Sequence, residues 1–417
     1  MKPLYDEKEA CSLEERKARQ DQALSRMVKL GYKKSTALKK ILDRQKINPA
    51  KIKTREDLEI LPVTSREKLV EMEMQNPPYA GLENPSTPMD RIFTSPGPVY
   101  EPHLSETDYL WARAFFAAGI GPHDIALNAF SYHLVAAGLT FHNGLRKVGA
   151  TVVPSGTSSS QVQVQLIRDL KVTAYVGTPS FLMSIINQAR EMGHDFKKDF
   201  RVKKACFAAE PLLPTLRQVF EKEYGIDTHQ MYGATEVGDV AYECSRKSGW
   251  HICEETIVEI VDPATGKNVE PGELGEVVVT RLNDIFFLLR FGTGDLSRLI
   301  TKKCSCGRTS WRLAGIAGRV GEAVKVRGLF IAPSQLKLLS GKFENLPLQA
   351  VVSRNGHEDV LTVRIEGVNK QVGTSTWENN FKKMFKEICT VRMDGIEYVN
   401  KGEIKPDQKL ILDAREW

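Results

Sequence analysis

Five side chains between residues 244 and 306 are of types that bind transition metals: Cys244, His251, Cys253, Cys304 and Cys306. Cys304 and Cys306 flank a single serine, so the chain is expected to turn tightly there. Three thiolates and one imidazole suit tetrahedral zinc, and a zinc ion with four protein ligands is structural. We therefore predict a structural zinc site at Cys244, His251, Cys304 and Cys306. Two alternatives stay open: Cys253 in place of His251, because alternate residues of a strand share a face, or reduced thiols that cluster without a metal.

The other three cysteines, Cys11, Cys206 and Cys389, stand alone in the sequence, as buried or incidental thiols do. The segment MKPLYDEKEACSLEERKARQ is too charged for a secretory signal. Together with the odd total of seven cysteines, this argues against a disulfide framework. We expect a cytoplasmic protein.

The stretch DRIFTSPGPVYEP, residues 90–102, has the outline of a phosphate-binding loop, with a glycine placed just after a short apolar run. Phosphate loops work through converging backbone N–H groups and a compensating cation. Here prolines remove two N–H donors, and Glu101 places a negative charge where it would repel a triphosphate. We expect the loop to keep its shape but to lose its usual phosphate chemistry.

The elements that must position these side chains can be read from the apolar pattern. Strand-like runs lie at residues 124–130, 150–156, 172–180 and 203–211, and amphipathic helical segments at 133–148, 159–170, 180–192 and 212–225. This alternation predicts an α/β fold with a parallel sheet covered on both faces, whose ligands bind at the carboxyl ends of the strands.

The flanking regions have different textures. Residues 13–44 read as two charged amphipathic helices, and Thr54 and Ser65 are helix-start signals followed by acidic residues. Residues 250–315 read as antiparallel, with a turn at 263–266 and a strand at 275–280.

A separate strand–helix pattern follows over the last ninety or so residues. We predict a large N-terminal domain over residues 1–318 with a helical front end to about 75, a hinge at about 319–321, and a small C-terminal domain over 322–417.

The bulk composition is that of an ordinary soluble protein, with 417 residues, 41% hydrophobic and 26% charged. The length exceeds the size at which a single core usually splits, which favours two domains. No apolar run approaches the roughly 20 residues needed to cross a bilayer. The net charge of +6 is partly concentrated near the front, where we interpret it as solvated helix faces. We expect neither a membrane nor a nucleic acid as partner.

Several motifs occur in one order: NAFSYHLVAAGLTFHNGLRKVGATVVPSG, VGTPSFLMSI, AAEPL, MYGATEVGDVAYEC, GELGEVVVTRL, RFGTGDL, GRVGEAVKVRG and APSQL. Together they resemble the adenylate-forming enzymes, and within them the phenylacetate–coenzyme A ligase family, over about residues 60–340. The resemblance implies a large domain of mixed and parallel sheets with an antiparallel subdomain, and a small, mobile α+β domain. Such enzymes activate a carboxylic acid with ATP as an acyl-adenylate, then transfer the acyl group to coenzyme A.

The resemblance also implies a nucleotide site. In AAEP, residues 208–211, it assigns Ala209, Glu210 and Pro211 to the adenine, together with Tyr232 and Gly233. Asp295 would accept hydrogen bonds from both ribose hydroxyls, which suits a carboxylate with two oxygens. Arg319 would reach the ribose or a phosphate.

By the same resemblance, Thr235 would donate a hydrogen bond to the α-phosphate and Glu236 would bind Mg²⁺ through oxygen. The family also has a lysine in the small domain that acts during adenylation. Alignment of the C-terminus puts Asp407 at its position, with Lys405 and Lys409 on either side. Lys409 is the better candidate. The hinge residue is Gly321, whose backbone tolerates wide angles.

The acid is expected to bind beside FSYHLVAAGL, where a strand ends and a helix begins. Tyr132 and His133 would line this pocket, while Ala136 and Gly138 leave room for an apolar or aromatic ring. The histidine could equally be packed for structural reasons. An aryl acid is what the family implies.

One departure from the family bears on catalysis. The family's phosphate loop reads Ser-Ser-Gly-Thr-Thr-Gly-Lys-Pro, whereas residues 95–102 read Ser-Pro-Gly-Pro-Val-Tyr-Glu-Pro. Three hydroxyl donors are lost, and Glu101 replaces the lysine. We predict an ATP-dependent acyl- or aryl-CoA ligase that uses ATP/AMP, Mg²⁺, coenzyme A and a small carboxylic acid, and the resemblance allows a homodimer. The alternatives are a non-catalytic nucleotide- or acyl-binding descendant, or an adenylating enzyme with a different acyl acceptor.

Overall fold

The computed structural model describes residues 4–95, 99–104, 110–327, 329–355, 358–367, 373–405 and 408–415. The chain forms two compact units. The first comprises Met1–Glu259, Val278–Thr293 and Leu299–Ala314, and the second comprises Ile260–Val277, Gly294–Arg298 and Gly315–Trp417. This division does not test where the chain bends, so the domain limits of 1–318 and 322–417 and the hinge at 319–321 stay predictions.

The first unit begins with a helical region. Its elements are a 3-10 turn (Glu7–Ala10), α1 (Leu13–Lys34), α2 (Thr36–Arg44), 3-10 turns at Pro49–Lys51 and Arg55–Ile60, β1 (Thr64–Ser65) and α3 (Arg66–Gln75). Ser35 separates the two long helices and caps α2 by accepting a hydrogen bond from the N–H of Leu38. Ser65 caps α3 in the same way, from the N–H of Lys68. The two predicted helices and the helix starts at Thr54 and Ser65 are confirmed.

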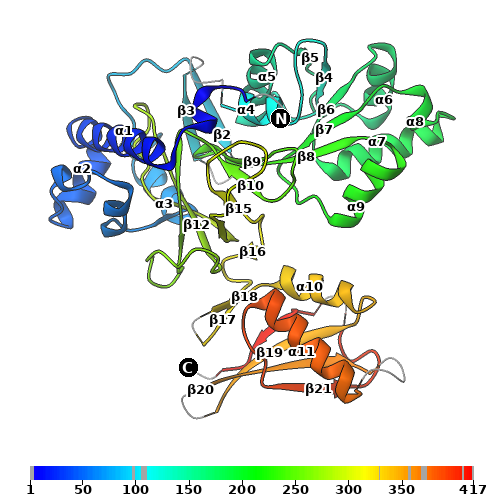
Figure 1. Cartoon of the computed structure of the whole chain (residues 1–417). Helices are drawn as coiled ribbons and strands as arrows, with labels where there is room; N and C mark the ends of the chain where they lie inside the picture. The colour runs from blue at the N-terminus through cyan, green and yellow to red at the C-terminus, as the bar shows by residue number, and fades with distance from the viewer. Residues whose placement is uncertain are drawn as a thin grey trace. The chain divides into compact units, whose positions relative to one another are not determined.

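A nine-stranded sheet dominates this unit, in the order β14-β15-β10-β9-β8-β7-β6-β4-β5. Its parallel half consists of β4 (Ile125–Asn128), β5 (Thr151–Val153), β6 (Ala174–Gly177), β7 (Lys204–Phe207) and β8 (Asp227–Ala234). The helices around it are α4 (Ala112–Ala117), α5 (Ala136–Lys147), α6 (Ser160–Asp169), α7 (Pro179–Glu191), α8 (Phe196–Asp199) and α9 (Pro214–Gln218), which a π turn (Val219–Glu223) extends (Figure 1). The predicted alternation of strands and helices is confirmed.

Successive residues of the parallel strands enter different cores, because strand side chains alternate between the two faces. Ala126 and Val176 belong to a cluster that includes residues of α4 and α5. Leu127 and Tyr175 belong to a cluster that includes residues of α6 and α7. The sheet is therefore covered on both faces, as predicted.

The remaining strands of this sheet are antiparallel: β9 (Gly238–Glu243), β10 (Trp250–Ile252), β14 (Leu299–Ile300) and β15 (Arg312–Leu313). A two-stranded hairpin consists of β2 (Arg91–Ser95) and β3 (Val99–His103). A further sheet has the order β1-β13-β12-β11, with β16 (Gly318–Arg319) paired to β13 (Phe291–Ser297). β11 (Thr256–Val261) and β12 (Gly275–Arg281) confirm the antiparallel texture predicted for 250–315, and Asp262 and Lys267 close the predicted turn (2.8 Å).

The second unit has its own small α+β core. Its elements are β17 (Val324–Val326), β18 (Leu329–Ile331), α10 (Pro333–Lys342), β19 (Leu348–Asn355), β20 (Glu358–Glu366), α11 (Ser375–Cys389), β21 (Gly395–Val399) and β22 (Ile411–Asp413). The last four strands form a sheet in the order β21-β20-β19-β22. Phe381 and Phe385 of α11 are fully buried in the same cluster as residues of β19 and β20.

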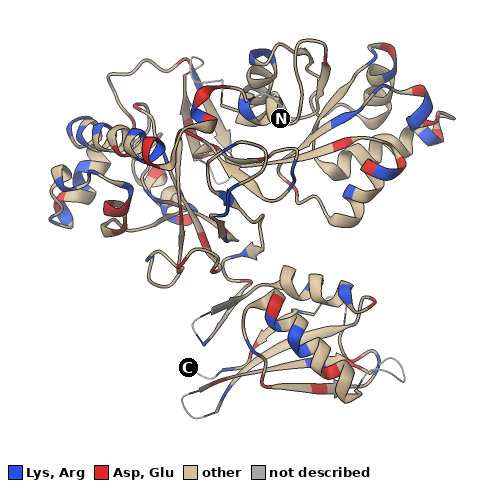
Figure 2. Ribbon diagram, viewed as in Figure 1, with Lys and Arg blue, Asp and Glu red and all other residues tan. Residues whose placement is uncertain are grey.

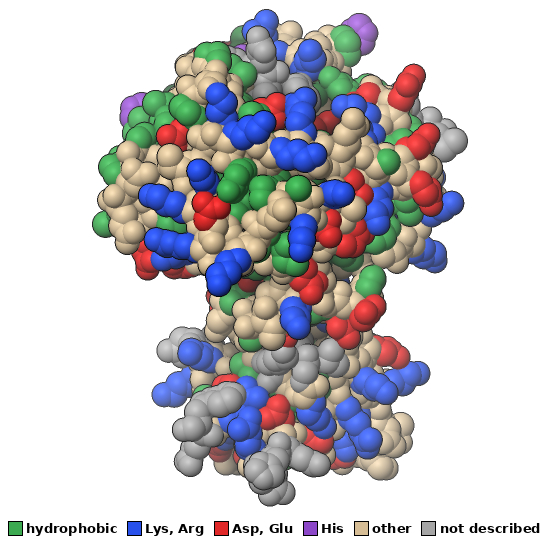
Figure 3. Space-filling view, turned by 90° about the vertical axis from the view of Figure 1, so that its left-hand side faces the viewer, with side chains coloured by type: hydrophobic (Ala, Val, Ile, Leu, Met, Phe, Trp, Pro, Cys, Tyr) green, Lys and Arg blue, Asp and Glu red, His purple; other side chains and the backbone are tan. Residues whose placement is uncertain are grey.

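The lysines of the basic stretches in the front region are exposed, as predicted, but Arg16 of α1 is buried in an ion pair with Glu254. Figure 2 shows both signs along α1, and the lysines of the stretch YKKSTALKK are exposed. The face in Figure 3 likewise has basic and acidic side chains interspersed, with hydrophobic side chains between them. Among the residues that the structure describes, no helix is long and apolar enough to cross a membrane.

Candidate functional site

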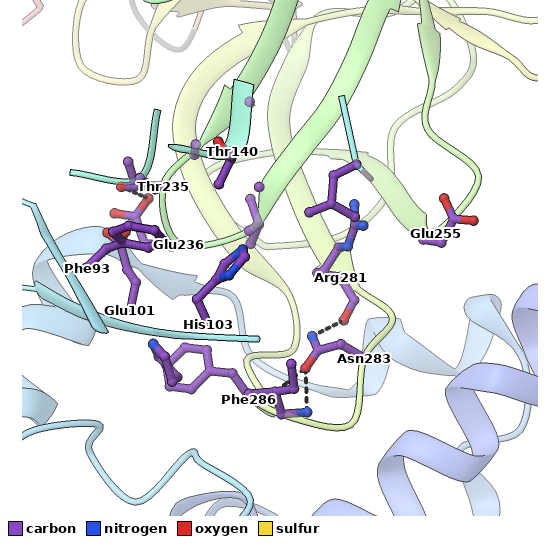
Figure 4. Close-up of a pocket in the computed structure, with 18 of the residues that line it drawn as sticks. Phe93, Glu101, His103, Thr140, Thr235, Glu236, Glu255, Arg281, Asn283 and Phe286 are labelled. Carbon is purple, nitrogen blue, oxygen red and sulfur yellow. Dashed lines mark hydrogen bonds between the residues drawn. The ribbon is translucent and has the colours of Figure 1, made fainter. Parts of the chain in front are cut away.

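A cavity of about 500 Å³ lies within the first unit (Figure 4). Its apolar lining includes Phe93, Trp111, Phe130, Phe141 and Phe286. Polar side chains gather at two ends: Glu101, Thr235 and Glu236 at one, and Glu255, Arg281 and Asn283 at the other, with His103 between them. Cavities with apolar walls and few polar groups are the usual form of small-molecule sites.

Two neighbouring parallel strands deliver the motif residues to this cavity. β7 ends at Phe207, and Ala208 and Ala209 then line the cavity. β8 runs into Gly233 and Ala234, which also line it. At Gly233 a Cβ would lie 2.3 Å from the carbonyl oxygen of Gly238 and 2.8 Å from the ring of Trp111, so only glycine fits there. The strand order thus brings AAEPL and YGATE to one space at the carboxyl edge of the sheet.

At the end with Glu101 and Thr235, Glu236 is buried, with a side chain only 1% exposed. Arg66, the first residue of α3, forms an ion pair with it. Arg66 also donates from Nη2 to the Ser95 hydroxyl (3.4 Å). Thr235 donates its hydroxyl to Oε2 of Glu236 (3.2 Å). The two predicted catalytic residues are therefore adjacent in the cavity wall, and a guanidinium balances the charge of one of them.

Glu101 contributes a second carboxylate at this end. It lies on β3 opposite Phe93, and the residue is 7% exposed. Burial raises the pKa of Glu101, and the nearby hydroxyls of Ser95 and Thr235 and the charge of Arg66 only partly oppose this. Within the described part of the chain, no group donates a hydrogen bond of normal geometry to either carboxylate oxygen. Of the loop, Pro96, Gly97 and Pro98 lie outside the described residues, so its expected shape is not described.

A third acid, Glu73 of α3, lies against the same hairpin and is 2% exposed. It accepts a hydrogen bond from the N–H of Tyr100 (2.9 Å). Burial raises its pKa to about 7, and the charge of Glu101 adds to the rise despite the Tyr100 hydrogen bond.

The opposite end of the cavity is fully paired. Arg113 donates to both oxygens of Glu255 (2.6 and 3.2 Å). Arg281 forms an ion pair with Asp239. Burial raises the pKa of Glu255, but Arg113 and Arg281 outweigh it and leave the pKa below its usual range. Asn283 accepts from the N–H groups of Ile285 and Phe286 and so holds the turn that carries Phe286 (Figure 4).

The predicted substrate-pocket residues are divided. Ala136 lines the cavity, whereas Tyr132, His133 and Gly138 do not. The Tyr132 hydroxyl accepts a hydrogen bond from Nδ2 of Asn128 (2.9 Å) and burial raises its pKa to about 12. His133 is exposed. Gly138 packs so closely on Ser131 that a Cβ would lie 2.2 Å from the carbonyl oxygen, which fixes the turn before α5.

The residues predicted to bind adenine are likewise divided between the cavity lining and other positions. Ala209 and Gly233 line the cavity, but Glu210 and Pro211 do not. Glu210 accepts a hydrogen bond from the Ser180 hydroxyl (2.8 Å). Tyr232 stacks on Trp250, with ring centroids 5.6 Å apart, and donates to the Thr293 hydroxyl (3.2 Å).

Three predicted residues belong to the second unit. Asp295 on β13 is opposite Arg319 on β16, with Oδ1 and Nε 3.7 Å apart. Lys409 is exposed, and its carbonyl oxygen accepts from Nε2 of Gln349 (2.7 Å). Asp407, at the position of the family's mobile lysine, lies outside the described residues.

The predicted metal ligands converge in the antiparallel half of the large sheet. The ligand atoms of Cys244, His251, Cys304 and Cys306 all lie within 4.8 Å of one another. The sulfurs of Cys244 and Cys304 are 3.8 Å apart, and the Cys306 sulfur is 3.4 Å from Nε2 of His251. His251 directs Nδ1 to the Ser310 hydroxyl (3.2 Å), an arrangement typical of metal-binding histidines. The four residues therefore lie together, and the zinc site itself stays a prediction.

Cys253, the alternative to His251, is part of the hydrophobic core instead. It is 3% exposed, and burial raises its pKa well above the usual value. Backbone N–H groups of Arg246 and Arg308 donate to the sulfurs of Cys244 and Cys306 (3.4 Å each). Such N–H groups favour thiolates, the form that binds metals.

Two residues of the polar end were not predicted, Arg66 and Glu73. No spacing in the sequence links them to Glu236 or Glu101. Arg66 reaches Glu236 because β1 pairs with β13 and places the start of α3 at the cavity. The serine cap at Ser65 indicated the helix but not its neighbour across the fold.

A family model described as "AMP-binding enzyme" matches residues 104–283. The chain is 32% identical to the phenylacetate-coenzyme A ligase of Escherichia coli (strain K12), over 86% of this chain and 84% of that protein. It is 31% identical to the enzyme of the same name from Aromatoleum evansii, over 91% and 88%. A solved 2-hydroxyisobutyryl-CoA ligase, an open conformation in complex with 2-HIB-AMP and CoA, superposes with a TM-score of 0.84 at 22% identity, over 99% and 95%.

Proposed function

The chain belongs to the phenylacetate–coenzyme A ligase family of adenylate-forming enzymes, and we propose that it activates a carboxylic acid with ATP and transfers the acyl group to coenzyme A. A carboxylate is a poor electrophile, and an AMP leaving group makes it reactive. The observation that supports this most directly is the shared cavity, where Ala209 from AAEPL and Thr235 and Glu236 from YGATE lie on one wall.

The roles of the site residues follow from their chemistry. Thr235 donates a hydrogen bond to the α-phosphate, and Glu236 binds Mg²⁺, which offsets phosphate charge during the in-line attack. Ala209, Glu210, Pro211, Tyr232 and Gly233 frame the adenine. Asp295 accepts from the ribose hydroxyls, and Arg319 lies beside it. Lys409 supplies the cation of the small domain during adenylation.

The acid is proposed to be an apolar aryl or acyl acid. Aromatic walls formed by Phe93, Trp111 and Phe141 favour such a group over a charged one. Ala136 leaves room at the start of α5, and Gly138 shapes the turn before it. Tyr132 and His133, the other two residues predicted for this pocket, do not line the cavity. Tyr132 would affect acid binding only indirectly, through its hydrogen bond to Asn128.

The test is exchange of labelled pyrophosphate into ATP, screened over a panel of aryl and fatty acids. We expect exchange with at least one apolar acid and its loss in Glu236→Gln. Glu223→Gln, which neutralises an exposed acid of the π turn, is the matched control and should retain exchange. AMP binding without any exchange would support a non-catalytic descendant, and exchange without thioester formation would indicate another acyl acceptor.

A structural zinc ion is proposed for Cys244, His251, Cys304 and Cys306, because three sulfurs and one imidazole nitrogen already converge. The ion would cross-link β10 to the segments after β9 and β14. Metal analysis of the purified protein should give one zinc per chain and none in the double variant Cys304→Ser, Cys306→Ser. Cys253→Ser is the control and should keep its zinc, and unchanged zinc in the double variant would contradict the assignment.

A further inference from the structure

Glu101 is a carboxylate in an unusual setting. The residue is 7% exposed, faces the cavity, and receives no hydrogen bond of normal geometry from the residues that the structure describes. Burying a charge in this way is costly unless a partner is bound. The group therefore fits a site whose partner is a ligand.

The surroundings identify the kind of ligand. Thr235 donates to Glu236 at 3.2 Å, and its hydroxyl is also near enough to Glu101 to affect that carboxyl. Figure 4 shows the three side chains grouped at one end of the cavity. Two carboxylates and a hydroxyl form an all-oxygen set, which is the preference of a hard cation such as Mg²⁺.

The charge balance points the same way. When both carboxyls are ionised, Arg66, Glu101 and Glu236 together carry one negative charge, which opposes a triphosphate. Glu73, within electrostatic reach of Glu101 and Arg66, adds more negative charge when ionised. One divalent cation converts the net charge of the three groups to positive, and this attracts phosphate.

We propose that Glu101 is a second carboxylate ligand, beside Glu236, of the Mg²⁺ that accompanies ATP. The cation takes the place of the lysine that the sequence lacks at position 101, so that metal instead of an ammonium group offsets the phosphate charge. This inference rests on the proposed function for the role of ATP, but the metal site itself does not depend on turnover.

The test uses Mn²⁺ as a paramagnetic substitute for Mg²⁺, titrated into the full-length protein and followed by electron paramagnetic resonance, with and without ATP. Loss of a charged ligand should weaken Mn²⁺ binding by about tenfold or more in Glu101→Gln. Glu101→Asp keeps the charge and should retain part of the affinity. Glu71→Gln is the control, an exposed acid of α3 that does not line the cavity, and should change the affinity less than about twofold.

A second arm restores the lysine of the family. Glu101→Lys should bind ATP in the presence of EDTA better than the unaltered protein does. It should also lower the dependence of ATP affinity on Mg²⁺ at least about fivefold. If Glu101→Gln binds Mn²⁺ as the unaltered protein does, the proposal is overturned and Glu101 merely repels phosphate. Failure of the unaltered protein to bind Mn²⁺ even with ATP overturns it as well.

These outcomes separate the metal site from the reaction. A Glu101-dependent Mn²⁺ site without pyrophosphate exchange for any acid would support the metal site and contradict the proposed function. If the protein catalyses pyrophosphate exchange but its affinity for Mn²⁺ does not depend on Glu101, the proposed function would be supported and the metal site contradicted. Thermal unfolding of each variant shows whether lost binding reflects lost folding.

Discussion

The two polar ends of the cavity have opposite electrostatic character. At one end Glu255 is held by Arg113, and its pKa is lowered. At the other end Glu101 receives no such contact from the described residues, and its pKa is raised. Both acids line one cavity, Glu101 buried and Glu255 with a side chain 16% exposed. The difference indicates that the first end is organised for stability, whereas the second is organised around a ligand.

The largest effect on stability is expected from removing an ion-pair partner at the end of the cavity that contains Glu255. Arg113→Met leaves Glu255 and Asp6 without the guanidinium that contacts both. Removing one partner of a buried ion pair should lower the free energy of unfolding by about 3 kcal/mol. Urea unfolding measures this, with Lys8→Met as control, because exposed Lys8 also contacts Glu255 and should cost less than about 1 kcal/mol. Equal losses in the two variants would mean that burial does not distinguish them.

The next effect concerns nucleotide binding at the unpaired end. Without Mg²⁺, AMP should bind at least as tightly as ATP, because the loop lacks charge-assisted hydrogen bonds of about 1.5–3 kcal/mol each and Glu101 repels the added phosphates. Calorimetry in EDTA compares the two nucleotides. Asp295→Ala should weaken both. ATP binding that is much tighter than AMP binding, and that Glu101→Ala weakens, would show that this region still binds the added phosphates.

The pH dependence of stability should also differ between the ends. Glu73, next to Glu101, has a pKa raised to about 7 in the folded protein from an ordinary value of 4.5. The folded state therefore binds more protons than the unfolded state between those values, and the contribution of Glu73 to stability falls as pH rises from 4.5 to 7. The slope is at most about 1.4 kcal/mol per pH unit.

The contribution of Glu255 to stability has the opposite pH dependence. Because the pKa of Glu255 is lowered in the folded protein, its contribution is lost as pH falls below 4.5. The free energy of unfolding, measured from pH 4 to 8 in the unaltered protein and in Glu73→Gln, isolates the contribution of Glu73. A difference between the two that does not vary with pH would contradict it.

The smallest effect is expected from neutralising Glu101. Glu101→Gln neutralises a buried carboxyl that receives no hydrogen bond of normal geometry from the described residues, so the metal-free protein should be unchanged or more stable by about 1 kcal/mol. Glu255→Gln is the counterpart at the paired end and should be less stable. Thermal unfolding in EDTA compares them, and a destabilised Glu101→Gln would show that the carboxylate has a structural partner.

The sequence determined the elements and the local donor sets. Periodic apolar runs predicted β4 to β8 and the helices between them, and the helix-start signals at Thr54 and Ser65 predicted the 3-10 turn Arg55–Ile60 and the start of α3. The cluster of Cys244, His251, Cys304 and Cys306, for which zinc is proposed, was also predictable from residue types and spacing: the structure puts His251 on β10, Cys244 directly after β9, and the other two cysteines in one short turn. These features depend on residues close in sequence or on motifs read in order.

The tertiary structure alone decided which charges meet. Arg66 reaches Glu236 across 170 positions of sequence, and Glu73 reaches Tyr100 through the packing of α3 on the hairpin. It also placed Ala136 in the cavity wall and left Tyr132 and His133 out of it, although all three lie within a few residues. The pKa of a buried acid depends on its neighbours in space. The contrast between Glu101 and Glu255 therefore exists only in the folded chain.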